Sequence, residues 1–219
     1  MLGSDETRAP TAHLQMRISA VLLVATIALT AGSCFLPWWG MGYQGSRWST
    51  HVWTTFSPTK WHIDSLDLDL VYSDAGRWGH VSELMGLMTT ALVLAIVFEI
   101  VVLGVVLLGN RQARWIFGSW IGVFLFVILV GFSANIGPAV NGSPGASVFD
   151  RQMIDPVSHV NVHFDFVGKA NTFPWFSGGE ICWGPLLGWW MMLLAFIICV
   201  FAVYISTSHP DSMDERADT

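Results

Sequence analysis

Two long apolar runs, separated only by the short polar turn at residues 109–114, constrain the fold of this chain more than any other feature. The first run, residues 84–108, is apolar except for Thr89, Thr90 and Glu99. The second, residues 115–136, is of similar length. At about 1.5 Å per residue, each helix would exceed the roughly 30 Å thickness of the hydrocarbon layer of a membrane. The two runs therefore predict a helical hairpin that spans a bilayer.

The composition supports a membrane protein and excludes a nucleic-acid-binding one. Hydrophobic residues make up 53% of the chain and charged residues 12%, whereas soluble proteins average about a quarter charged residues. The net charge is -6, and the ten lysines and arginines are scattered. Because nucleic-acid binding requires a basic patch that displaces counterions, we set that class aside. No motif indicates a cofactor, so none is expected.

Two further apolar runs complete a prediction of four spans, at residues 17–37, 83–108, 115–136 and 183–206. Pro37 ends the first span, and Pro185 fits the first turn of the last one, where its missing N–H costs nothing. Residues 29–34 also resemble a lipoprotein cleavage site, which leaves a cleaved signal as the alternative for the first run. Residues 1–16 and 207–219 are polar and are expected to be terminal segments in solvent.

The positive-inside rule orients these spans. Arg17, Arg111 and Arg114 flank span ends, and arginine and lysine concentrate in cytoplasmic loops. We therefore expect both termini and the turn at residues 109–114 to be cytoplasmic, in a cell membrane. Residues 38–82 and 137–182 then form two outer loops.

Both outer loops contain residue patterns typical of strands. Apolar and polar residues alternate at residues 66–72 and, most clearly, at residues 159–167, while residues 47–56 and 61–64 are rich in aromatic and β-branched residues. Because an isolated strand is not stable, the two loops are expected to join in one small outer β-sheet. The fold class predicted is thus a four-helix transmembrane bundle with a small extracytoplasmic sheet. Asn141-Gly142-Ser143 is formally a glycosylation acceptor.

This plan resembles two groups of membrane proteins. Four spans, a β-rich first loop and the Pro37-Trp38 pair after the first helix resemble the claudin-type tetraspan plan. The stretch Gly184-Pro185-Leu186-Leu187-Gly188-Trp189 is similar to the start of the last helix in uncharacterised four-helix proteins of bacteria and archaea. Claudins carry paired cysteines in the first loop, and residues 38–82 contain none, so a junctional function is not implied.

Glu99 is the main candidate for an intramembrane site. Arg17 and Glu83 stand at span ends, so Glu99 is the only acidic or basic residue in the interior of a predicted span, and such residues are costly in a membrane. With no cation in the other spans, we expect it to be uncharged or hydrogen-bonded. Matching depths along the spans places Thr26, Ser119 and Trp120 near it. A proton or cation relay, a contact with a partner subunit and a neutral hydrogen-bonding residue all remain open.

Two weaker candidates lie in the predicted outer region. His163 and Asp165 could hold a metal ion with ligands from another strand, although the same residues also suit the wet face of a sheet. Tryptophans gather near the expected outer interface, where an aromatic belt is common. The tryptophans assigned to it are Trp38, Trp39, Trp183, Trp189 and Trp190. Cys34 and Cys182 are close enough in expected depth to pair.

The function expected from these patterns is non-enzymatic. Close-packing pairs at Ala28/Gly32, Gly118/Gly122 and Gly184/Gly188 favour helix association. We therefore expect an accessory subunit or interaction module of a membrane complex, whose outer sheet faces a protein partner or a second copy. The alternative is a transporter or an ion- or proton-conducting component that uses Glu99. A metal-dependent enzyme at the outer face is the third possibility.

Overall fold

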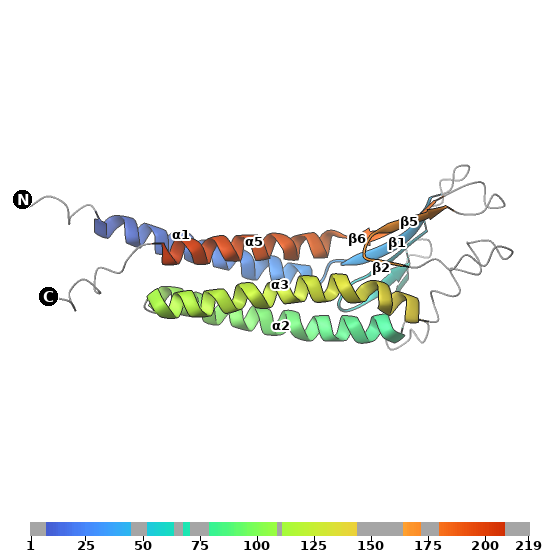
Figure 1. The fold of residues 1–219 in the computed structure, drawn as a ribbon, viewed down its shortest axis with the longest axis horizontal. Coiled ribbons are helices and arrows are strands. Elements are labelled where there is room, and N and C mark those ends of the chain that lie inside the picture. Colours follow the sequence, from blue (N-terminus) through green and yellow to red (C-terminus); the bar gives the residue numbers. More distant parts are fainter. Residues whose placement is uncertain are drawn as a thin grey trace, which may run out of the picture. The chain divides into compact units, whose positions relative to one another are not determined.

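The structure is a computed structural model that describes residues 8–44, 52–63, 68–70, 79–108, 111–143, 164–171 and 180–208. It is mostly helical, with a small antiparallel sheet. The helices are α1 (Arg8–Ser33), α2 (Gly79–Leu108), α3 (Arg111–Gly142) and α5 (Leu187–Thr207), shown in Figure 1. All four are long and apolar enough to cross a membrane, which suggests a multi-pass membrane protein.

The helix ends differ from the predicted spans in three places. Helix α1 begins at Arg8, so residues 8–16 are helical and not part of an irregular terminal segment. Helix α3 continues past residue 136 to Gly142 with Pro138 inside it. Helix α5 begins at Leu187 and not at residue 183, because Glu180–Pro185 forms a strand. Pro185 therefore ends a strand and does not open the last helix.

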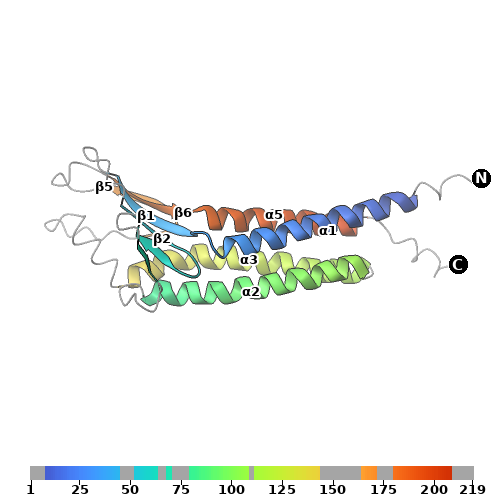
Figure 2. The same cartoon turned by 180° about the vertical axis from the view of Figure 1, so that it is seen from behind.

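Six strands form one sheet in the order β4-β3-β2-β1-β6-β5. Their bounds are β1 Trp39–Gln44, β2 Val52–Phe56, β3 Trp61–Ile63, β4 Leu68–Leu70, β5 Gly168–Asn171 and β6 Glu180–Pro185. The central antiparallel pair β1–β6 joins the two predicted loops, with Trp39 opposite Pro185 and Gln44 opposite Glu180. Figure 2 shows β1 between β2 and β6. A small sheet with strands from both loops is thus confirmed.

The individual strands match the sequence patterns unevenly. Three predicted strands are confirmed in part, as β2, β3 and β4, and the remaining residues of these predictions lie outside the described part. The strand predicted at residues 159–167 is wrong for residues 164–167, which are irregular, and its residues 159–163 lie outside the described part. The backbone of this segment instead bonds to side chains: Asn141 bonds both the N–H and the C=O of Phe164, and Trp39 Nε1 donates to Phe166 O.

The chain divides into two compact units, each with its own core. The first, called the helical unit, comprises Met1–Ala31, Val93–Val127 and Met192–Thr219. The second, called the sheet unit, comprises Gly32–Leu92 and Ile128–Met191. Each long helix contributes residues to both units.

One face of the sheet forms an aromatic core in the sheet unit. Trp39 and Met41 lie two residues apart on β1, so they share a face, and Phe56 and Trp183 lie opposite them on the neighbouring strands. All four side chains are buried. The Phe164 ring completes the cluster, with its centroid 4.9 Å from that of Trp183. Burial of several large rings makes this face the main apolar core of the unit.

Candidate functional site

Glu99 lies in the helical unit with its side chain fully buried. Its Oε1 atom accepts a hydrogen bond of 2.9 Å from the Thr30 hydroxyl on α1. Its Oε2 atom is also buried and has no hydrogen-bond partner among the described residues. A buried polar atom without a partner costs about 1–3 kcal/mol and calls for an explanation. The carboxyl group of Glu99 is therefore the strongest candidate site in this unit.

The α1 face that packs in the interior carries a row of hydroxyl groups. The fully buried residues of this helix are Ser19, Leu23, Thr26, Thr30 and Ser33. Their spacings of three, four or seven residues put them on one helical face. The Ser19 hydroxyl donates to Ala202 O on α5, and the Thr26 hydroxyl donates to Leu22 O on its own helix. Thr30 is the member of this row that reaches Glu99.

The partner of Glu99 is thus a residue that the sequence analysis did not single out. Thr26 is buried on the same face, one turn from Thr30, but its hydroxyl bonds to its own backbone. Ser119 and Trp120 are exposed, with Trp120 64% accessible. They point outward because Gly118, Ile121 and Gly122 occupy the buried face of α3. The spacing of the α1 hydroxyls was the signal in the sequence that could have identified Thr30.

Other polar groups of the helical unit lie at the ends of α3 and α5. The guanidinium Nε of Arg111 donates to Thr207 O at the carboxyl end of α5. A cation at this position is favourable because the last carbonyls of a helix carry partial negative charge. Arg114 is buried near the start of α3, and Cys199 is buried on α5.

The metal site proposed at His163 and Asp165 lies partly outside the described residues. Asp165 is exposed, and His163 lies outside the described residues. Among the residues that can be placed, no group of three His, Cys, Asp or Glu side chains could hold an ion. Cys34, Cys182 and Cys199 are not joined by a disulfide. Burial raises the pKa of Cys34, an effect partly offset by a backbone hydrogen bond.

Three of the five tryptophans assigned to an aromatic belt are instead core residues. Trp38, Trp39 and Trp183 are buried, and only Trp190 is largely exposed. Trp39 and Trp183 are buried because β1 and β6 direct their side chains into the core on one face of the sheet. Trp38 packs edge-on against Phe132, with a centroid distance of 5.1 Å, and its Nε1 donates to Ser33 O.

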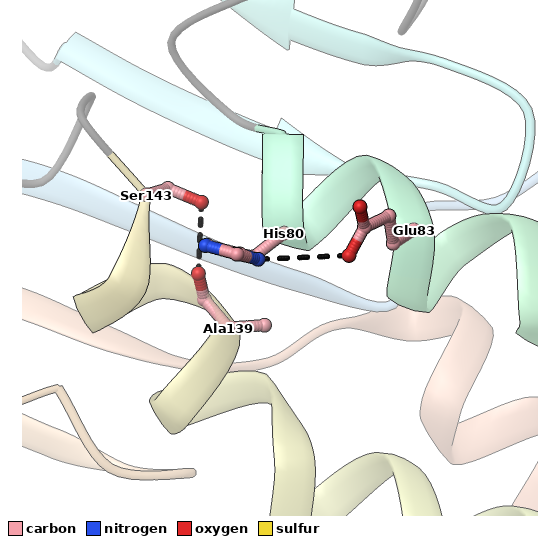
Figure 3. Close-up of polar contacts among 4 residues, drawn as sticks. All are labelled: His80, Glu83, Ala139 and Ser143. Atoms are coloured by element: carbon pink, nitrogen blue, oxygen red, sulfur yellow. Dashed lines mark hydrogen bonds and ion pairs between the residues drawn. The ribbon is translucent and has the colours of Figure 1, made fainter.

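A serine, a histidine and a carboxylate meet where α2 begins and α3 ends (Figure 3). His80 Nδ1 lies 3.5 Å from Glu83 Oε2, and both side chains are exposed. The buried Ser143 hydroxyl donates to Ala139 O, so its hydrogen is not directed to the imidazole. A serine nucleophile requires that proton to go to its general base. The hydroxyl bond lies at the end of α3 and the imidazole–carboxylate contact lies within α2, so this geometry is not that of a serine nucleophile with its general base.

Comparison with known proteins adds no family to these observations. No protein-family model matches the chain, and a search of curated proteins finds no match. These comparisons do not support the resemblance to claudin-type proteins. The resemblance to the uncharacterised four-helix proteins rested on Gly184 and Pro185 as the start of the last helix, and both residues instead lie in β6.

Proposed function

We propose that the protein is an integral multi-pass protein of a cell membrane, with both termini in the cytoplasm and the sheet outside. Support comes from the outward faces of the helices, which carry many exposed large apolar side chains. Soluble monomers rarely expose contiguous apolar patches larger than a few hundred Å². On α2 alone these side chains are Leu87, Val93, Leu94, Val97, Ile100, Val101, Leu107 and Leu108.

Within that membrane we propose a non-enzymatic role, as an accessory subunit or interaction module whose sheet contacts a protein partner. The observation that carries this proposal is the way the sheet is fixed to the helix ends. Trp38 N donates to Phe56 O, Leu186 N donates to Trp38 O, and Gly188 N donates to Pro37 O. The first bond ties the turn between α1 and β1 to β2, and the other two tie it to the residue between β6 and α5 and to the first turn of α5. Sites supported on rigid elements bind with less loss of conformational freedom.

The edge of the sheet supplies a contact surface for such a partner. Strand β5 is last in the strand order and pairs only with β6 among the described strands. Exposed strand edges can take up an additional strand from a partner. Val167, directly before β5, is 61% accessible, and Lys169 within β5 is also exposed.

A photo-crosslinking amino acid at Val167 tests this role in the native membrane. We expect it to trap one partner, or a second copy, in a stoichiometric adduct that mass spectrometry identifies. The same amino acid at Gln112, which is exposed at the start of α3, is the matched control and should not trap that partner. Equal trapping at both positions, or none at Val167, would contradict the role.

A second candidate function, an ion- or proton-conducting component, is favoured by one specific observation. The Oε2 atom of Glu99 is buried without a hydrogen-bond partner among the described residues, and its Oε1 atom accepts from Thr30, one of the buried hydroxyls of α1. Ionisable residues inside membrane spans commonly mark ion and proton pathways. Measurement of proton flux into liposomes that contain the purified chain, compared with Glu99→Gln, tests this candidate.

A further inference from the structure

The groups around Glu99 restrict which ion it can bind. Its carboxyl group and the Thr30 hydroxyl are the side-chain oxygens that the structure brings together here. Helices α1 and α2 are continuous through Thr30 and Glu99, so their backbone carbonyls are engaged in helical hydrogen bonds. Metal cations such as Ca²⁺ take about six to eight oxygen ligands, and Mg²⁺ about six. Two side chains on unbroken helices cannot supply such a shell, whereas a proton needs one oxygen.

The lack of an ion pair to Glu99 among the described residues also favours a bound proton. Helix α1 brings the hydroxyls of Ser19, Thr26 and Thr30 to its buried face, and α5 contributes the buried Cys199 thiol to the same unit. Helix α3 contributes Arg114 to the same unit, and no ion pair of Glu99 is found among the described residues.

A buried carboxylate that has one hydrogen bond and no cation is costly, because the low-dielectric interior does not replace the water it loses. A protonated carboxyl group avoids this cost and leaves at most one O–H group without an acceptor. The neutral form is therefore the one that fits the surroundings of Glu99.

We infer that Glu99 and Thr30 form a buried proton-binding site, in which Thr30 fixes Oε1 and Oε2 binds and releases the proton. The proton comes from water and returns to it, so the step needs no other reactant. Thr30 is a positioning residue, because its hydroxyl orients the carboxyl group and does not carry the exchanged proton. A transport role for this site rests on the second candidate function, and the site identifies the proton as the conducted ion.

Infrared spectroscopy of the purified full chain in lipid tests the site directly. The difference between the wild-type and Glu99→Gln spectra isolates the carboxyl group, because protonated acids and carboxylates absorb at different frequencies. We expect the band of a protonated acid at neutral pH and its replacement by carboxylate bands as the pH becomes alkaline. A carboxylate at every pH, or a protonated acid at every pH, would overturn the inference.

Two threonine variants separate positioning from general packing. In Thr30→Val the carbonyl of the acid loses its hydrogen bond, so its band should move to a higher frequency. Thr26→Val removes a hydroxyl from the same buried face, but one that bonds to Leu22 O, so the band should stay in place. Equal shifts in the two variants, or no shift in Thr30→Val, would contradict the role of Thr30.

The infrared result and the flux result can fail independently. A site that exchanges its proton in liposomes without net flux keeps the inference and rejects the second candidate function. Flux that survives in Glu99→Gln also rejects Glu99 as the conducting residue. If no carboxyl band changes with pH in the infrared spectra, the proton-binding site is rejected, whatever the flux measurement shows.

Discussion

Gly188 approaches Trp38 so closely that a methyl group on its Cα would lie 2.5 Å from Trp38 Cδ1. The same methyl group would lie 2.8 Å from Leu36 O and 3.0 Å from Pro37 O. Backbone atoms cannot move aside as a flexible side chain can. The start of α5 therefore meets the turn between α1 and β1 through a contact that only glycine permits.

Gly188→Ala should destabilise the sheet unit by about 1–3 kcal/mol, the usual cost of overpacking. Gly131→Ala is the matched control, because a methyl group there would meet nothing within 4 Å. Since alanine favours helix over glycine by about 1 kcal/mol, the control should be neutral or slightly stabilising. Thermal unfolding in detergent, followed by circular dichroism, measures both. A Gly188→Ala protein as stable as the control would show that the contact is not tight.

Gly118 makes the corresponding contact in the helical unit. A methyl group there would overlap with Val203 Cγ1, whereas one at Gly122 would lie 3.7 Å from Val200 Cγ2. We expect Gly118→Ala to destabilise the protein and Gly122→Ala to have little effect. Val203→Ala should partly rescue Gly118→Ala, with a coupling of about 0.5–3 kcal/mol in a double-mutant cycle. Additive effects of the two changes would contradict direct packing.

The helices could be predicted because their signal is local: a long apolar run has few alternatives to a helix. Strands β1 and β6 were missed because their tryptophans also suited an interface belt. The pattern Trp39-Gly40-Met41-Gly42 does alternate large residues with glycine along β1. The alternation typical of a strand was therefore present, but the residue types alone could not decide between a strand and an interfacial aromatic belt.

Matching depths along the spans did not identify the partner of Glu99, because the partner depends on the rotation of each helix about its axis. Depth along a span gives no information on that rotation. The contact between Gly118 and Val203 turns one face of α3 to α5, which leaves Ser119 and Trp120 outside. Thr30 meets Glu99 because α1 presents its row of hydroxyls to the interior.

Cys34 should react slowly with thiol reagents near neutral pH. Its pKa is raised by burial, so a smaller fraction is thiolate at a given pH, and the thiolate is the nucleophile. Alkylation of a variant that retains only Cys34 should lag behind that of a free thiol and should accelerate at alkaline pH. Unfolding in denaturant should remove the lag. A folded rate equal to the unfolded rate would contradict the burial of the thiol.

The orientation can be tested with single cysteines at Gln112 and Asp165, both of which are exposed. In a variant without the native cysteines, a membrane-impermeant maleimide added to intact cells should label position 165 and not position 112. The opposite labelling pattern would reverse the orientation that Arg111 and Arg114 indicate.

Asn141 holds Phe164 by two hydrogen bonds, because its Nδ2 donates to Phe164 O at 2.8 Å and its Oδ1 accepts from Phe164 N at 2.9 Å. Since the amide is engaged on both sides, we expect no glycan on Asn141 in the folded protein. Asn141→Asp would place an oxygen against Phe164 O and should destabilise the protein by about 1–3 kcal/mol.

The loss in Asn141→Asp should shrink at acidic pH, because a protonated carboxyl group can again donate to Phe164 O. Thermal unfolding at several pH values measures it. The control is Asp165→Asn, an exchange between the same residue types at an exposed neighbouring position, which should be nearly neutral. A pH-independent loss in Asn141→Asp would mean that the missing donor is not its cause.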